Sequence, residues 1–232
     1  RDLLQIKLRD NLVRQRVDII SSVRFTLKSM GLKIASPNTQ CFAKRCRQNL
    51  AALDPVLLAH CEPSLRVIDA LTLSIRELEK QIESLCEKRY PQTEILRKIA
   101  GVGPITALTF VLTIGDPRRF RSNRDVAAYL GLVPRRDQSG ETDKQLRISK
   151  AGDAYLRRLL VSAAHYILGP FGPDCDLKRH GEQLAAKGGR GAKKKAVIAI
   201  ARKLSVLLLT LWSRGESYEP LRKALPLETR AA

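Results

Sequence analysis

The sequence lacks the usual marks of secreted, zinc-binding and membrane-spanning proteins. Its five cysteines are irregularly spaced with no Cys-x-x-Cys pair, which favours a reduced, cytoplasmic protein over a disulfide framework. Three histidines lie far apart, and His165, inside an apolar helical run, is interpreted as a core residue rather than a ligand. The apolar run 204–212 is far shorter than the roughly 20 residues of a membrane span. We therefore expect no metal or cofactor in this chain and no membrane partner.

Aromatic and acidic residues are also scarce. Aromatic side chains make up 5% of the chain, too few to suggest the base-stacking platforms of many RNA-binding proteins. Asp and Glu number 23 against 42 Lys and Arg, so the formal charge is 42 − 23 = +19, and the sequence pI is about 10.2. So many like charges repel one another and destabilise a compact chain unless a polyanion is present. Nucleic acid is the polyanion that this composition favours, ahead of a membrane surface.

The expected fold is mainly α, in two zones. Residues 1–90 are predicted as a coiled-coil or helical-hairpin spacer and assembly region, with helices at 2–30, 45–60 and 63–89. Between residues 68 and 85, Ile and Leu alternate at heptad spacing. This pattern fits two helices packed within one chain and equally an intermolecular coiled coil, which would make a homo-oligomer. Because Arg1 already lies inside the periodic segment, we expect the chain to begin within a longer protein.

The second zone, residues 91–218, is predicted as a compact helical domain followed by a tail over 219–232. Helices are expected at 94–99, 104–114, 123–130, 153–168 and 193–213, with a short extended pair within 132–148. The segment 169–191 is rich in Gly, Pro and charge, and we expect a loop there. Its basic end, continuing to Lys193, Lys194 and Lys195, is a candidate clamp for a nucleic-acid backbone.

Gly101 and Gly103 frame a tight turn between two of these helices, with Pro104 at the first position of the second helix. This is the pattern of a helix-hairpin-helix, in which main-chain N–H groups at the start of the second helix hold a DNA phosphate. A plain corner between two helices would show the same glycines. The basic composition favours the DNA-binding interpretation.

The pair Ser139-Gly140 lies in a predicted polar loop among basic residues. A hydroxyl beside cations suits phosphoryl chemistry, because the hydroxyl can attack phosphorus and the cations stabilise the charge that builds up. A solvated turn would use the same Ser-Gly pair, and on spacing alone it is the plainer interpretation. The residues predicted to bind DNA phosphates are Gly101, Gly103, Arg135, Arg136, Arg147, Lys150, Arg157, Lys193, Lys194 and Lys195.

Several stretches together resemble the C-terminal transposase domain of the DEDD-type insertion-sequence transposases, whose better-studied members are bridge-RNA-guided recombinases. They read ILRKIAGVGPITALTFVLTIGDPRRFRSNRDVAAYLGLVPRRDQSG, ISKAGDAYLRRLLVSAAH and GAKKKAVIAIARKLSVLLLTLW. The resemblance covers residues 92–218 closely and the preceding helical region loosely. The combination of the GVG turn, YLGLVP, the SG pair and ISKAG is more specific than any one of these motifs.

The resemblance implies three parts: an N-terminal RuvC-like domain with an acidic, magnesium-binding tetrad, a coiled coil, and a serine-bearing domain. It maps the family's serine onto Ser139, with a transient phosphoserine link to DNA, and it implies a guide RNA as a further partner. Nothing before residue 90 looks like alternating strands with acidic ends. We therefore expect this chain to hold the nucleophile without the magnesium site, and to be inactive by itself.

Without the resemblance, two interpretations of different classes remain open. The chain is part of an enzyme that breaks and rejoins DNA through Ser139, or it is a noncatalytic helix-hairpin-helix module that binds DNA and assembles through a coiled coil. RNA binding is a weaker third interpretation, since aromatic residues are few.

Overall fold

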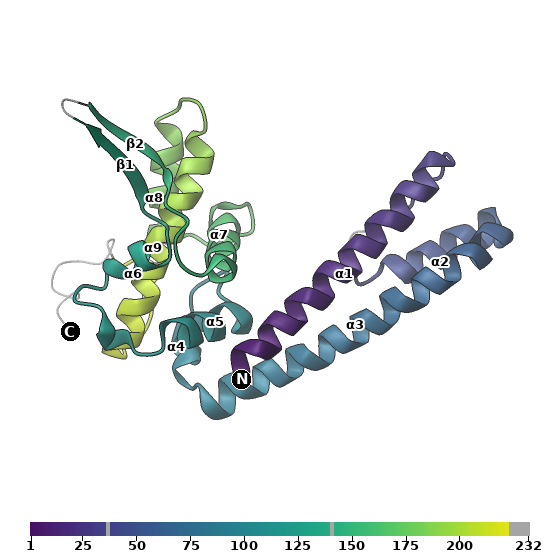
Figure 1. Ribbon diagram of the computed structural model, residues 1–232, viewed down its shortest axis with the longest axis horizontal. Coiled ribbons are helices and arrows are strands. Elements are labelled where there is room, and N and C mark those ends of the chain that lie inside the picture. Colours follow the sequence, from purple (N-terminus) through teal and green to yellow (C-terminus); the bar gives the residue numbers. More distant parts are fainter. Residues whose placement is uncertain (36–37, 140–141, 223–232) are drawn as a thin grey trace. The chain divides into compact units, whose positions relative to one another are not determined.

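The computed structural model confirms a mainly α fold (Figure 1). It describes residues 1–35, 38–139 and 142–222. The chain divides into two compact units, Arg1–Ser84 and Leu85–Ala232, which are described separately. The boundary predicted between a spacer region ending at residue 90 and a second domain starting at residue 91 stays a prediction.

Unit 1 is built around two long antiparallel helices, α1 (Asp2–Ser29) and α3 (Pro55–Arg89), of which α3 continues into unit 2. Contacts between them step in opposite directions along the two helices: Arg9 pairs with Glu79, and the Arg16 guanidinium donates to the Thr72 hydroxyl at 3.3 Å. The heptad positions Ile68, Ile75 and Ile82 are buried. The periodic seam is therefore covered within one chain.

The helix predicted at 45–60 is in fact two segments. Helix α2 (Phe42–Leu53) ends at Asp54, whose backbone is extended, and α3 starts at Pro55. The Asp54 carboxylate accepts a hydrogen bond from the Leu57 N–H at 3.0 Å, which caps the new helix. Proline suits this first position because it has no N–H to lose. The α3 helix then runs through Pro63 into the segment predicted at 63–89.

An ion-pair cluster fixes α2 against α3. The Arg47 guanidinium donates to Glu62 at 2.9 Å and to Asp69 at 2.7 Å, so one arginine bridges two turns of α3. Below it, Phe42, Cys46 and Leu50 of α2 are fully buried in the core of unit 1.

Unit 2 is organised around a central helix, α9 (Ala192–Arg214), which packs against α4, α6, α7 and α8 (Figure 1). The other elements are α4 (Gln92–Arg97), α5 (Pro104–Ile114), the 3-10 turn η1 (Pro117–Arg119), α6 (Asp125–Tyr129), β1 (Pro134–Ser139), β2 (Thr142–Ile148), α7 (Ala154–Leu168) and α8 (Asp176–Ala186). Helix α9 is long and apolar enough to cross a membrane, but half of its most apolar stretch is buried inside unit 2. It is the core helix of this unit.

Two sequence interpretations in unit 2 are wrong. The segment 169–191 contains a full helix, α8, which the charged and glycine-containing sequence concealed. Gly181 lies where α8 meets α9, and a Cβ there would stand 2.9 Å from a side-chain carbon of Ile200. His165 is exposed on α7 rather than buried, because the apolar face of that helix turns the other way, through Leu160, Ala164 and Ile167.

The predicted extended pair is confirmed as an antiparallel β-hairpin. Its register pairs Asp137 with Lys144 and Ser139 with Thr142, and the register shifts between Pro134 and Arg136. Ser139 is the last residue of β1, so it belongs to a strand end rather than to a long loop. The predicted tail lies partly outside the described residues; within them, the Pro220 carbonyl accepts a hydrogen bond from the Asp176 N–H at 2.8 Å.

Candidate nucleic-acid interface

The base of the hairpin is fixed by two glycines at a close chain crossing. A Cβ on Gly131 would lie 2.3 Å from the Ala151 nitrogen, and one on Gly152 would lie 2.1 Å from the Tyr129 carbonyl oxygen. Both glycines have positive φ, +67° and +70°, which other residues rarely adopt. The segments YLG and KAG therefore pass each other at a distance that no side chain permits.

Arg157 clamps this crossing. One of its terminal nitrogens donates to the Leu130 carbonyl at 3.1 Å and to the Ala151 carbonyl at 2.6 Å. Lys150, beside it, has the left-handed φ of 58° and keeps its side chain exposed. Of the two residues, Lys150 is the one exposed to solvent and able to contact a phosphate, whereas Arg157 donates hydrogen bonds to the protein's own backbone.

The hairpin places the predicted site residues at two different levels. Arg135 and Arg147 are exposed near its base, and Ser139 ends β1 beside the connection to β2. Ser139 lies four residues further along the strand than Arg135, about 13 Å at the usual rise per residue. The side chains of Arg136 and Ser139 lie outside the described part. A DNA substrate would therefore have to extend along the hairpin from base to tip in order to contact both Ser139 and these cations.

The turn between α4 and α5 is the candidate helix-hairpin-helix. Gly101 has φ +83°, and a Cβ on it would stand 3.0 Å from the Ala163 carbonyl oxygen and 3.1 Å from a ring carbon of Tyr166. The turn is thus pressed against α7. Gly103 precedes α5 in an extended conformation and is exposed, with Pro104 at the first helical position. Thr93, buried inside α4, donates its hydroxyl to the Tyr90 carbonyl at 2.7 Å and caps no helix end.

Lys193, Lys194 and Lys195 are exposed on the first turn of α9. Three cations at a helix N-terminus oppose the helix dipole, which favours negative charge at that end. No acidic residue lies in the first turn to offset them. The N–H groups of Ala192 and Lys195 already donate to the Gly189 and Gly191 carbonyls, so the lysine side chains and the helix dipole are what an incoming anion would meet at this end.

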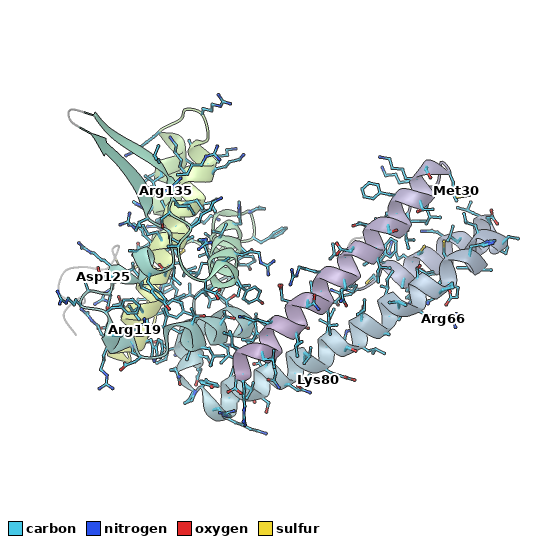
Figure 2. All side chains as sticks on the ribbon, viewed as in Figure 1. Met30, Arg66, Lys80, Arg119, Asp125 and Arg135 are labelled. Carbon is cyan, nitrogen blue, oxygen red and sulfur yellow. The ribbon has the colours of Figure 1, made fainter. Side chains whose placement is uncertain are left out.

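A basic surface around η1 carries arginines to which the sequence pattern assigns no role. The Arg119 guanidinium lies 5.5 Å from the Phe120 ring centre and 4.9 Å from that of Tyr129, and it donates to the Ile114 carbonyl at 3.3 Å. Arg118, Arg121 and Arg124 are exposed around it. The cluster of arginines within residues 118–124 of the sequence could have indicated this basic surface. Figure 2 shows Arg119 and Arg135 on different parts of unit 2.

Metal ligands do not gather in the part of the chain that the structure describes: no three His, Cys, Asp or Glu side chains there lie close enough to share an ion. All five cysteines are free. Cys46 and Cys175 are buried, and burial raises the pKa of the Cys46 thiol to about 11.

Comparison with known proteins finds one family model and several relatives that match this chain. Residues 93–174 match the family model described as Transposase IS116/IS110/IS902 family. The transposase for insertion sequence element IS1111A of Coxiella burnetii is 31% identical over 225 residues, covering 92% of this chain and 58% of that protein. A probable family 20 transposase of Pseudomonas aeruginosa is 30% identical over 222 residues, covering 92% of this chain and 64% of that protein.

A third relative has a different name. The pilin gene-inverting protein of Moraxella lacunata is 33% identical over 162 residues, covering 68% of this chain and 46% of that protein. The chain thus spans less than two thirds of the length of these relatives. Residues 93–174 are thus similar to the IS116/IS110/IS902 transposase family, and the first two of these relatives are named as transposases.

Proposed function

We propose that this chain is the DNA-binding, serine-bearing part of an insertion-sequence transposase. The observation that carries the proposal is the family match over residues 93–174, which includes the complete hairpin and Ser139. The exposed cations of unit 2 and the formal charge of +19 support DNA as its partner. A cytoplasmic location accords with the five free cysteines.

In this proposal the Ser139 hydroxyl oxygen attacks the phosphorus of a scissile phosphodiester. A bond forms between serine oxygen and phosphorus, the bond from phosphorus to one deoxyribose oxygen breaks, and the hydroxyl proton leaves to a base while the released oxygen takes up a proton. The strand end stays on the protein as a phosphoserine ester. Attack by the hydroxyl of another strand reverses the step and joins new ends.

The backbone of the DNA would be held at several places. The α4–α5 turn would offer main-chain N–H groups from the start of α5, as in a helix-hairpin-helix. Arg135, Arg147 and Lys150 would contact phosphates at the hairpin base, and Lys193, Lys194 and Lys195 would contact them at the start of α9. We assign Arg157 to the chain crossing, because it donates hydrogen bonds to the carbonyl oxygens of Leu130 and Ala151.

Two further components come from the resemblance alone. A guide RNA would supply target choice, and a RuvC-like domain would supply magnesium-binding carboxylates. The described residues of this chain hold no three-ligand cluster for such an ion, and no step above is routed through a metal. Homo-oligomer formation through unit 1 would use its outer surface, since the heptad seam packs within the chain.

The alternative is a noncatalytic module that binds DNA through the α4–α5 turn. A denaturing gel separates the two functions. The protein extended to the length of its relatives is incubated with end-labelled insertion-sequence DNA, and label that stays with the protein after denaturation marks a covalent link. Ser139→Ala should remove that label while leaving DNA binding intact. Label that persists in Ser139→Ala would refute the serine assignment, and binding without any label would favour the module.

A further inference from the structure

Phe171 is the most exposed large hydrophobic side chain in the described part of the chain, with 84% of its surface accessible. It lies on the connection between α7 and α8, in the sequence Gly169-Pro170-Phe171-Gly172-Pro173. An aromatic ring left in water forgoes the stabilisation that burial would bring. A ring held in this way therefore calls for an explanation.

The turn that carries Phe171 is held in place from three sides. The Gly172 N–H donates to the Gly169 carbonyl at 3.2 Å. The Lys178 ammonium donates to the Gly172 carbonyl at 2.7 Å and to the Gly169 carbonyl at 3.4 Å. A Cβ on Gly172 would lie 2.2 Å from the Ile167 carbonyl oxygen, so the turn sits directly on the end of α7. The ring is presented by a fixed support.

The surroundings of Phe171 do not form an apolar patch. In the described part of unit 2 the other exposed large hydrophobic residues are Tyr129, Leu146 and Tyr166. Of these, Tyr166 is on the same end of α7, where its carbonyl accepts the Gly169 N–H at 3.1 Å. A protein-binding hot spot is normally surrounded by further packed contacts that exclude water. A single projecting ring suits a partner that supplies apolar surface on both of its faces, as two stacked base pairs do.

The same end of α7 adjoins the proposed phosphate-binding turn. A Cβ on Gly101 would stand 3.1 Å from the Tyr166 ring, so Tyr166 lies against the α4–α5 turn. The nearby carboxylate of Asp174 is paired with Arg179 at 2.5 Å, and this arginine lowers the pKa of Asp174. Asp174 follows the Phe171 turn in the sequence, and its negative charge is thus offset by a cation.

We propose that Phe171 is a wedge that inserts between two base pairs of duplex DNA while the α4–α5 turn holds the backbone. Apolar side chains used in this way unstack a base step and bend the duplex, and the ring replaces part of the lost stacking. The inference rests on the proposed DNA-binding function and adds a positioning residue to it.

The test is DNA unwinding, because a wedge unwinds the duplex wherever it inserts and the target sequence need not be known. Relaxed circular plasmid is mixed with the chain and with topoisomerase I, the protein is removed, and the topoisomers are resolved on a gel. Plasmid occupancy is measured in parallel by gel shift. Phe171→Ala, Phe171→Trp and the matched control Phe25→Ala are compared at equal occupancy; Phe25 is a 70% exposed aromatic residue of unit 1.

We expect the unmodified chain and Phe25→Ala to shift the topoisomer distribution equally. In Phe171→Ala the shift per bound chain should fall about tenfold, and Phe171→Trp should restore it. An unchanged shift in Phe171→Ala, or no shift by a chain that binds the plasmid, would overturn the wedge. Failure of the unmodified chain to bind plasmid at all would instead count against the proposed function. If Phe171→Ala changes the sedimentation of the chain but not its unwinding of DNA, the ring contacts a second copy of the chain, and the proposal is overturned as well.

Discussion

A Cβ on Gly131 would lie 2.3 Å from the main-chain nitrogen of Ala151, which is closer than these two atoms can approach. The close pass joins the end of α6 to the segment before α7, and the hairpin emerges from it. Glycine is required here for two reasons, the contact and the φ of +67°. The position of the hairpin therefore depends on a residue that has no side chain of its own.

Gly131→Ala should destabilise unit 2 by about 3 kcal/mol, combining a left-handed backbone cost of about 1–2 kcal/mol with overpacking at the crossing. The readout is urea unfolding followed by the fluorescence of Trp212, the single tryptophan, which packs against Phe110. Gly188→Ala is the control, since Gly188 has φ +73° and no neighbour within 4 Å. Equal losses in the two variants would show that the crossing contributes nothing.

Arg157→Ala should lower the stability of unit 2 by about 1–2 kcal/mol, because the Leu130 and Ala151 carbonyl groups lose their charged donor. Arg158→Ala, which removes the next arginine and its contact with the Tyr155 ring, serves as the comparison. Trp212 fluorescence during urea unfolding again measures both. If Arg157→Ala leaves stability unchanged and weakens DNA binding instead, the phosphate-binding role predicted from the sequence is correct and the clamp is not.

Replacing Lys193, Lys194 and Lys195 together by Ala should weaken binding to every DNA sequence. With roughly six phosphates neutralised, the log–log dependence of binding on salt has a slope of about −5, and losing three contacts should reduce that slope by about 2.7. Fluorescence anisotropy across a salt series measures the slope. Lys28, Lys33 and Lys44 are exposed in unit 1, and their triple replacement by Ala removes the same charge as a control. Identical slopes for the two triple variants would show that the lysines at the start of α9 have no specific role in DNA binding.

Cys46 should resist alkylation in the folded chain, because burial raises the pKa of its thiol to about 11 from the ordinary 9.0. Only the thiolate reacts, so labelling should stay slow up to about pH 9 and increase toward pH 11. The same shift means that unit 1 is stabilised below pH 9 and loses that stability as the pH rises through 11, since the unfolded thiol ionises first. Mass-spectrometric peptide mapping checks the labelling, with exposed Cys41 as the reactive reference. Equal labelling of the two cysteines at pH 8 would contradict the core packing of α2.

Much of the fold could be predicted from the sequence because its helices are strongly periodic. The predicted helix 104–114 agrees with α5 at both ends, since Pro104 and Gly115 mark them. Helix α8 was missed because its exposed face is charged and its buried face rests partly on Gly181, where a close helix contact replaces an apolar side chain. His165 was misplaced because a mostly apolar run does not show which positions face outward.

The candidate site could be predicted only in part. Sequence motifs marked Gly101, Ser139 and the lysines of α9, each of which belongs to a local pattern. The bonds from Arg157 to Leu130 and Ala151 join segments far apart along the chain, and no local pattern reports them. The exposure of Phe171 was hidden for a similar reason, because it results from Lys178 fixing a turn several residues away.

The central claim is that Ser139 is the nucleophile of a DNA strand-exchange reaction, and one recombination assay tests it most directly. The protein extended to the length of its relatives is supplied with a plasmid that carries the insertion-sequence ends, and recombinant junctions are counted by quantitative PCR. Ser139→Ala should bind DNA and unfold within about 0.5 kcal/mol of the unmodified protein, as expected when a single hydroxyl at the end of a strand is removed, yet its junctions should fall to background. Junctions formed by Ser139→Ala at the normal rate would contradict the claim and leave the chain as a DNA-binding module.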